Sequence, residues 1–413
     1  SIRIIMLARF FNQNYKSLII IILTLLGVII YSNTFHNSFH FDDESSITSN
    51  FAIRNIGNIQ NIWNFWPTRF ITVLSFSLNY YFHGLRVSGY YIANLLIHIM
   101  ASIGVYWLVL LTLSSETFKK DRLREYPVLI ALLASLIFLS HPIQTESVAY
   151  IHQRATSLMG LCYILSICFY ARSRLLPKDN KDWKVSYAIS WIFALLSMFT
   201  KENAITLPFT ILLYEYCFFK TSKPLKKGCI FPFLALLPVI PMLLFLTKPK
   251  TFVNVTDIME KPVSGYYYLL TQLRVLVTYI RLLFLPINQN LDYDYAMSKT
   301  FLDPAVIISL VFLLAILVIA IRIFNKYRLI SFSIFWFFLT LLPESSIIPL
   351  KDDVIFEHRL YLPMVGYSFF LASGLYYLLK EKRVKLIIII LSLLVACYSI
   401  MTYARNLVWK DEF

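Results

Sequence analysis

The sequence predicts an all-α protein that crosses a membrane many times. Hydrophobic residues make up 58% of the chain and charged residues only 15%, against roughly a quarter charged residues in a soluble domain. Runs such as SLIIIILTLLGVIIY (17–31) and KLIIIILSLLVACYSIM (385–401) approach the roughly 20 residues that a helix needs to span hydrocarbon. The net charge is +15. The Lys and Arg residues that produce it gather in short connectors between such runs, as the positive-inside rule expects for cytoplasmic loops. This distribution therefore indicates topology and not nucleic-acid binding.

The first apolar segment, 18–33, is predicted to be a retained anchor. A secretory signal peptide would end in a small-residue cleavage site, and none follows this run. The next predicted span begins near residue 89, which leaves a connection over 34–88. A connection of this length is too long for a plain linker, so we expect interfacial helices and functional residues in it.

Ten further apolar segments complete a prediction of about eleven transmembrane helices. Segments 127–140 and 329–342 look short for a full crossing, so their ends are expected to extend into the adjoining loops. The second long connection is 248–303, and it is also expected to hold an interfacial helix. The ten segments are 89–113, 127–140, 156–171, 185–200, 204–219, 229–247, 304–321, 329–342, 360–379 and 386–404.

Segment 266–287 is apolar but carries Arg274 and Arg281. If it crossed the membrane, the basic connectors after it would fall on both sides. If it lies in the interface, every basic connector is cytoplasmic and these connectors, with the N-terminus, hold most of the 38 Lys and Arg residues. We therefore expect an interfacial helix, a cytoplasmic N-terminus and an exterior C-terminus.

The five cysteines lie in or beside apolar segments. None has the spacing of a metal site, and a disulfide framework is not expected. They are Cys162, Cys168, Cys217, Cys229 and Cys397.

Ionisable residues gather in the exterior loops, each near a predicted helix end. Any one of them alone is best explained as a solvated loop charge. Lys201 and Glu202 are different, because they lie between two apolar runs with almost no loop, and charges at such depth usually face a polar cavity or a partner. Glu215 is expected to lie near the cytoplasmic end without companions, and Glu44 to be solvated. The exterior set is Asp42, Asp43, Glu44, Arg69, His83, His141, Glu146, His152, Arg154, Lys201, Glu202, Asp292, Asp294, Glu357, His358 and Arg359.

This mixture of carboxylates and arginines suits group transfer from a lipid that carries a phosphate. Arginine binds phosphate oxygens in a bidentate manner. A carboxylate can accept the proton of an incoming hydroxyl as a general base. A bundle with interfacial helices offers an apolar groove for the lipid tail, and cations can stabilise the anionic leaving group without a general acid.

Five motifs in order resemble a known family. They are the F-DD order in the first loop, RFITVLSFSLNYYFHG, HPIQTESVAYIHQRATSL, TKENAITLPFTILLYE and EHRLYLPMVGYSFFLASGL. Together they resemble the TMTC-type branch of the GT-C glycosyltransferases, relatives of the protein O-mannosyltransferases, over about residues 30–410. The resemblance implies a GT-C fold and inverting transfer of a sugar, mannose or another hexose, from a polyprenyl-phosphate donor to a Ser/Thr hydroxyl of a protein acceptor. The expected face is periplasmic, in a bacterial inner membrane, or lumenal in the endoplasmic reticulum.

The resemblance also implies roles for individual residues. The base would be Asp42 or Asp43, and the first of the pair is favoured. Arg69, Arg154, Lys201 and Arg359 would bind the donor phosphate or sugar, or organise the acidic site. Glu146, Glu202 and Glu357 would position those cations, with His141 in support, whereas His358 stands in EHR where animal members more often have ER and has no assigned role.

The chain also departs from the family pattern. We expect residues 1–404 to form the catalytic membrane domain and 405–413 to begin an exterior extension. TMTC-type proteins continue there into TPR repeats, and none is present in this sequence. No cofactor is expected besides the lipid-linked sugar. A divalent metal at the acidic run is conceivable but not favoured, because oxygen-rich runs are weak predictors of metal sites.

Three other functions remain open from the sequence. The acceptor could be a lipid or an oligosaccharide instead of a protein. The chain could also be a lipid flippase or transporter, but that class places ionisable groups near the bilayer midplane and shows broken helices in corresponding halves. Here the charges gather at one face. A non-catalytic scaffold is the third alternative, and it would not need the Lys201-Glu202 turn.

Overall fold

The computed structural model describes residues 2–177, 181–219, 233–247, 264–345, 354–379 and 383–410. Throughout these ranges the regular structure is helical, which confirms the all-α prediction. Cys229 and parts of the predicted segments 229–247, 248–303 and 405–413 lie outside the described residues.

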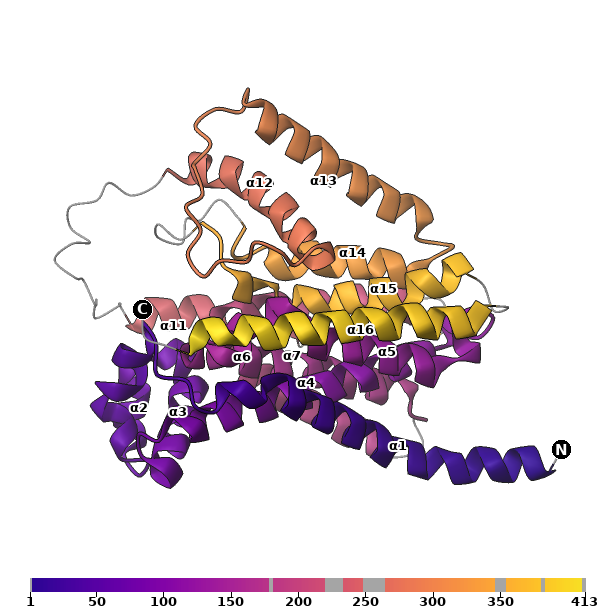
Figure 1. Ribbon diagram of the computed structural model, residues 1–413, viewed down its shortest axis with the longest axis horizontal. Coiled ribbons are helices and arrows are strands. Elements are labelled where there is room, and N and C mark those ends of the chain that lie inside the picture. Colours follow the sequence, from indigo (N-terminus) through magenta and orange to yellow (C-terminus); the bar gives the residue numbers. More distant parts are fainter. Residues whose placement is uncertain are drawn as a thin grey trace.

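Long helices run side by side and form the body of the protein (Figure 1). The central helix α7 packs against both α4 and α8, and α5 packs against α4 and α15. The helices of this bundle are α1 (Ile2–Tyr31), α4 (Val87–Leu113), α5 (Pro127–Ser140), α7 (Arg154–Leu175), α8 (Asp182–Met198), α9 (Leu207–Phe218), α14 (Arg328–Leu341), α15 (Pro363–Leu379) and α16 (Val384–Asn406).

Five helices in the described part of the chain are long and apolar enough to cross a membrane. A bent pair, Pro127–Ser140 with Pro142–Ala149, adds a sixth if its two parts form one span, and two shorter helices, α14 and α15, are also apolar. These helices match eight of the predicted spans, so the multi-pass class is supported, whereas the count of eleven stays a prediction. The five are Ser17–Thr34, Val87–Leu113, Ile151–Leu175, Pro304–Ile323 and Val384–Trp409.

The bend after Ser140 follows from the local sequence. The residue before a proline disfavours helical backbone, and His141, which precedes Pro142, is extended with φ −69° and ψ 129°. The chain then re-enters helix as η7 (Pro142–Gln144) and α6 (Thr145–Ala149). The predicted segment 127–140 therefore does extend into the adjoining loop, but with a bend of 52°.

Both long connections that were predicted to be exterior contain helices, as expected. In the first, α2 (Ile59–Phe65) and α3 (Phe70–His83) lie at the end of the bundle where the C-terminus also lies (Figure 1). They are preceded by η1 (Ser32–Thr34), η2 (Glu44–Thr48) and η3 (Phe51–Arg54), and η4 (Pro67–Arg69) separates them. Apolar side chains of this region form a second, smaller core with Tyr90 and Tyr91 of α4.

Helix α12 (Gly265–Phe284) holds the segment that was predicted to be interfacial. It lies with α13 (Pro304–Ile323) on one side of the bundle, inclined to it (Figure 1). Its Gln272 donates to the Val354 carbonyl at 2.8 Å, and its Tyr279 hydroxyl donates to the Phe356 carbonyl at 3.0 Å. Helix α12 is not among the candidate spans, and its interfacial position stays a prediction. Helix α11 (Val239–Thr247) completes the described helices.

Glu215 was expected to have no companions, and this interpretation is wrong. Its carboxylate accepts two hydrogen bonds from Arg174, at 2.9 and 2.6 Å, and a third from the Tyr170 hydroxyl at 2.9 Å. The pair is buried between α7 and α9. Sequence could not show this, because Arg174 is 41 residues away and meets Glu215 only through helix packing.

A glycine on α7 allows the segment before α15 to approach closely. A Cβ atom at Gly160 would lie 2.7 Å from two ring atoms of Tyr361. Tyr361 is buried, and its hydroxyl is fixed by a 3.0 Å hydrogen bond with His98, so its ring has little room to move. This contact positions η11 (Glu357–Leu360), which carries three of the predicted site residues.

We predict that Gly160→Ala destabilises the protein by about 1–3 kcal/mol, because overpacking a closed site forces its neighbours to shift. The measurement is the thermal midpoint in detergent. Gly374→Ala is the matched control, since a Cβ there meets nothing within 4 Å and alanine is favoured in a helix by up to about 1 kcal/mol. An unchanged midpoint for Gly160→Ala would contradict the close packing of Tyr361.

Candidate active site

The three adjacent carboxylates of the first loop have different environments. Asp42 and Glu44 are exposed, whereas Asp43 is completely buried. The opposite exposure of Asp42 and Asp43 follows a turn at Phe41, whose φ of 43° lies in the left-handed region. That conformation is unfavourable for a bulky residue, and such strain persists only where the surroundings impose it. The turn sends one aspartate outward and its neighbour inward.

Asp43 fastens the first loop to the connection between α6 and α7. Its Oδ2 accepts a hydrogen bond from the His40 amide at 3.0 Å, and its Oδ1 accepts one from the His152 amide at 2.6 Å. Burial raises the pKa of Asp43 to about 7, although both amide hydrogen bonds oppose the rise. With both oxygens occupied inside the protein, Asp43 has the surroundings of a structural residue.

Asp42 has the surroundings of a reactive carboxylate. The Tyr150 hydroxyl donates to its Oδ2 at 2.9 Å and accepts from its amide at 3.0 Å. This two-point contact orients the side chain, while its exposure leaves it accessible to a substrate. Burial, together with the charges of Asp42 and Asp43, raises the pKa of Tyr150, so its hydroxyl stays a hydrogen-bond donor.

Arg69, on a different element, is the first cation of the same charged region. The Arg69 guanidinium forms an ion pair with Glu202, with Nε 3.2 Å from Oε2, and stacks 4.2 Å above the Trp66 ring. The Thr68 hydroxyl donates to Oε1 of the same glutamate at 2.7 Å. Burial would raise the pKa of Glu202, but Arg69 and Thr68 outweigh it and lower the value. Arg69 is thus held in place with its side chain 20% exposed.

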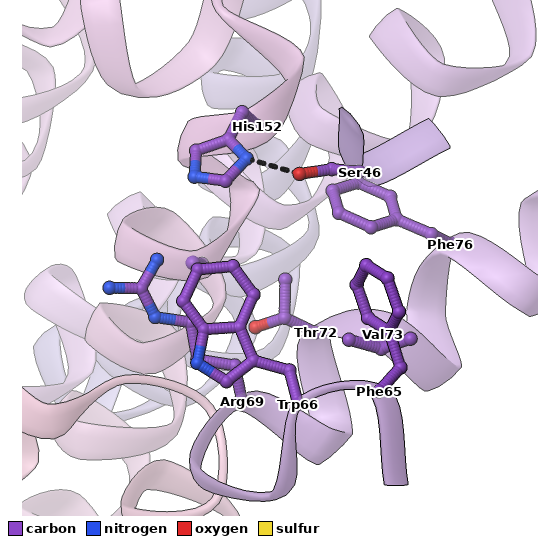
Figure 2. Close-up of a pocket in the computed structure, with 9 residues that line it drawn as sticks. Ser46, Phe65, Trp66, Arg69, Thr72, Val73, Phe76 and His152 are labelled. Carbon is purple, nitrogen blue, oxygen red and sulfur yellow. Dashed lines mark hydrogen bonds between the residues drawn. The ribbon is translucent and has the colours of Figure 1, made fainter. Parts of the chain in front are cut away.

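A small pocket lies against Arg69 and Trp66 (Figure 2). Aromatic side chains form one wall, and the ring of His152 faces them from the other side. One nitrogen of that ring shares a 2.7 Å hydrogen bond with the Ser46 hydroxyl. The full lining is Ser46, Phe65, Trp66, Arg69, Thr72, Val73, Phe76, His152 and Ala155.

Lys201 is buried, and its ammonium is bonded only to neutral oxygens. It donates to the Thr156 hydroxyl at 2.7 Å and to the Gln153 side-chain carbonyl at 3.4 Å. Among the described residues no carboxylate lies within ion-pair distance of it. Burial lowers its pKa to about 8, although the charge of Glu344 opposes the change. A buried, charged ammonium without a counter-ion is costly, and an anionic ligand would supply that counter-ion.

Glu146 and His358 form a second pair at the same end of the bundle. The His358 amide donates to Glu146 at 2.9 Å, and its ring nitrogen Nδ1 shares a 2.5 Å hydrogen bond with the other carboxylate oxygen. Burial and the positive charge of Lys201 hold the pKa of His358 well below its usual range. The low pKa favours the neutral form of the ring.

Arg359 and Glu357, the two neighbours of His358, point to different partners. Arg359 lies 4.0 Å from Glu344 and donates to the Val354 carbonyl at 3.0 Å. Glu357 is fully buried and accepts hydrogen bonds from a loop, at 2.7 Å from Gln289, 2.9 Å from the Asn290 amide and 2.5 Å from Tyr293. Arg405 of α16 completes this set at 3.6 Å. Glu357 therefore ties together three chain segments.

Arg154 and His141 have surroundings that belong to the scaffold. Arg154 donates to side-chain oxygens of Asn94 and Asn79 at 2.6 and 2.5 Å, and to the Tyr90 carbonyl at 3.0 Å. With 1% of its surface exposed, its geometry favours holding α3 to α4 over phosphate binding. His141 bonds the Leu283 carbonyl at 2.9 Å and so fixes the end of α12.

The separate pairs converge on one charged region. The charges of Asp42, Arg69, Lys201 and His358 all act on the ring of His152, and those of Lys201, Arg359 and Arg69 act on His358. These residues come from loops 34–88, 141–155, 201–203 and 343–359, all of which were predicted to be exterior. No group of three or more His, Cys, Asp or Glu side chains in the described ranges could hold a metal ion.

Several residues of this region were not singled out from the sequence. Tyr150 lies within the HPIQTESVAYIHQR motif, but a tyrosine in an aromatic-rich chain carries no distinctive signal. Glu344 and Tyr268 meet Arg359 only in the folded chain. Trp66 lies three residues before Arg69 in the sequence WPTR. This closeness of an aromatic residue and an arginine was the signal for a cation–π contact.

The different surroundings of the two aspartates predict different effects of the same substitution. Asp43→Asn places an amide NH₂ against one of two backbone N–H donors, so we expect a loss of about 1–3 kcal/mol of unfolding free energy. Asp42→Asn should leave the thermal midpoint unchanged within about 1 °C, because surface substitutions cost little. Thermal unfolding of the two purified variants measures both, and equal midpoints would contradict the structural role of Asp43.

Comparison with known proteins identifies homologues along the chain. No protein-family model matches it. A protein O-mannosyl-transferase of Caenorhabditis elegans is 25% identical over 97% of this chain and 57% of its own length. The human protein O-mannosyl-transferase TMTC3 is 25% identical over 97% of this chain and 47% of its own length. The chain thus spans about half the length of the curated relatives it matches.

One solved structure resembles the fold. It is the archaeal oligosaccharyltransferase AglB from Archaeoglobus fulgidus in complex with an inhibitory peptide and a dolichol-phosphate, with 11% identity and a TM-score of 0.47 over 96% of this chain and 56% of that chain. A score below 0.5 does not by itself establish a shared fold. The sequence comparisons do establish kinship: the chain is a relative of the TMTC-type protein O-mannosyl-transferases over nearly its whole length, which confirms the resemblance seen in its motifs.

Proposed function

We propose that this chain is the membrane domain of an inverting glycosyltransferase of the GT-C type. Its donor is a sugar linked to a polyprenyl phosphate, and its acceptor is a Ser or Thr hydroxyl of a protein. The observation that carries the proposal is the exposed carboxylate of Asp42, oriented by Tyr150. It lies in one charged region with the cations Arg69, Lys201 and Arg359, whose charges act on the neighbouring histidines His152 and His358. The named activity of the relatives, protein O-mannosyl transfer, supports a sugar donor and a protein acceptor.

The proposed step is a single displacement at the anomeric carbon. The acceptor oxygen forms a bond to this carbon from the face opposite the phosphate, and Asp42 takes the hydroxyl proton as general base. The bond between the anomeric carbon and the phosphate oxygen breaks, and its electron pair stays on the released polyprenyl phosphate. The configuration at the carbon is inverted.

The cations bind the phosphate and stabilise the charge that it gains. Lys201 is the strongest candidate, because its buried ammonium has only neutral partners in the described structure. Arg69 is held by Glu202 and Trp66 with part of its side chain exposed. Preorganised charges of this kind contribute most where water is excluded.

The orientation of the chain follows from the same proposal. The site lies at the end of the bundle that holds the predicted exterior loops, so donor and acceptor meet at the periplasmic face of a bacterial membrane or the lumenal face of the endoplasmic reticulum. Most Lys and Arg residues lie in the connectors that were predicted to be cytoplasmic, in agreement with the positive-inside rule. The N-terminus is then cytoplasmic.

The first test of the proposal is Asp42→Asn. Loss of the base should lower kcat by about 10²–10⁴-fold, with little change in donor KM, measured as transfer from a polyprenyl-phosphate sugar to an acceptor peptide. Glu44→Gln is the matched control, because it removes an exposed carboxylate two residues away and should retain activity. Wild-type rates for Asp42→Asn would reject Asp42 as the base.

The second test uses the lowered pKa of Lys201. Below about pH 8 its ammonium is charged and binds phosphate, and above this value it becomes neutral. Donor KM should therefore rise roughly tenfold above this pH, because a charge-assisted hydrogen bond contributes about 1.5–3 kcal/mol. Lys201→Arg keeps its charge at these pH values and should abolish this rise. A wild-type KM that stays constant across pH 7 to pH 9 would exclude Lys201 as the titrating phosphate ligand.

A further inference from the structure

The chain that follows the last helix folds back onto the first loop. Residues Leu407–Trp409 form η13 directly after α16, and the Trp409 side chain is only 2% exposed. Its ring stacks on Tyr150, with centroids 5.4 Å apart and planes inclined by 18°. Its carbonyl accepts a hydrogen bond from His40 Nε2 at 2.8 Å. Trp409 thus joins the C-terminal end to two segments of the candidate site.

Both contacts of Trp409 lead to the acidic run. Tyr150, under the stacked ring, donates its hydroxyl hydrogen to Asp42 Oδ2 at 2.9 Å and accepts from the Asp42 amide at 3.0 Å. His40 donates its amide to Asp43 at 3.0 Å. The tryptophan therefore supports the turn around Phe41 from two sides, through one aromatic ring and one backbone bond.

The end of α16 holds Trp409 in a fixed position. Asn406 donates to the Ile30 carbonyl at 3.0 Å and to Asn33 at 3.1 Å, both at the end of α1. Arg405 donates to the Gln289 carbonyl at 2.9 Å and lies 3.6 Å from buried Glu357. These bonds connect the residues just before Trp409 with three other parts of the fold.

We propose that Trp409 is a positioning residue for the transfer reaction. It fixes the plane of the Tyr150 ring so that the phenol holds the Asp42 carboxylate in one orientation. The inference rests on the proposed function, in which Asp42 is the base. It makes the segment that leaves the last helix part of the active site, so movement of that segment changes the geometry of the base.

The physical reason is the exposure of Asp42. An exposed carboxylate loses rotamer freedom only through its contacts, and a misplacement of about 1 Å can cost 10²-fold in rate. The stacked ring does the holding, because the Trp409 indole N–H has no hydrogen-bond partner among the described residues. Phenylalanine, which keeps an aromatic face, should therefore replace it in large part.

The experiment compares three substitutions in the full chain. Trp409→Leu keeps apolar volume but loses the stack, and we expect kcat to fall about tenfold or more while donor KM changes less than about threefold. Trp409→Phe should retain at least about a third of the activity. Tyr150→Phe removes only the hydroxyl and should lower kcat as much as Trp409→Leu or more. Val408→Ala, at an exposed neighbour, is the control and should be unchanged.

A double-mutant cycle tests whether Trp409 acts through Tyr150. If it does, Trp409→Leu combined with Tyr150→Phe lowers kcat no more than Tyr150→Phe alone, because coupled residues are not additive. The proposal would be overturned if the two losses in kcat multiplied in the double variant. It would also be overturned if Trp409→Leu changed KM alone. Should Trp409→Leu fail to fold, the expected activity of Trp409→Phe and loss in Tyr150→Phe still test the arrangement.

A second readout does not depend on activity. The thiol introduced by Asp42→Cys is labelled with an impermeant maleimide, and the labelled peptide is measured by mass spectrometry. Trp409→Leu should change the labelling rate several-fold, and Val408→Ala should not. If Trp409→Leu changes the labelling rate of Asp42→Cys, but the chain with Asp42 intact transfers no sugar, the proposed function is rejected and the positioning is kept. If the chain with Asp42 intact is active and Trp409→Leu changes neither its kcat nor the labelling rate of Asp42→Cys, the positioning alone is rejected.

Discussion

The site depends on one buried carboxylate. Asp43 accepts backbone hydrogen bonds from His40 in the first loop and from His152 before α7, and so fixes two segments that lie more than 100 positions apart in the chain. Burial disfavours the charged form of a carboxylate. It therefore raises the pKa of Asp43, although the two backbone hydrogen bonds oppose the rise. The left-handed backbone at Phe41 lies in the turn between His40 and the two aspartates, of which Asp42 is exposed and Asp43 buried.

The remaining charges divide between scaffold and site by how completely the protein satisfies them. Glu357 and Arg154 are buried and surrounded by partners from several segments, so they hold the fold together. Asp42 is exposed, and the buried Lys201 is left with neutral partners in the described chain. An incompletely compensated cation and an accessible carboxylate whose charges act on the same histidine, His152, suit an anionic substrate.

Elements from both ends of the chain meet at this region. The first loop supplies the acidic run, the α6–α7 connection supplies Tyr150 and His152, and the residues after α16 supply Trp409. Because these parts contact one another directly, a displacement of any of them is transmitted to Asp42.

The sequence by itself determined the helical membrane class, the two long connections with their helices, the clustering of charges in the loops predicted to be exterior, and the kinship with TMTC-type proteins. These features depend on local composition, on loop length and on motifs, all of which can be read directly from the sequence. Only the tertiary structure decided which of Asp42 and Asp43 is exposed, that Glu215 is paired with Arg174, that Arg154 is enclosed between α3 and α4, and that Trp409 stacks on Tyr150. Each of these depends on a partner 41 or more residues away, or on a strained turn imposed by distant contacts, and neither leaves a local signal.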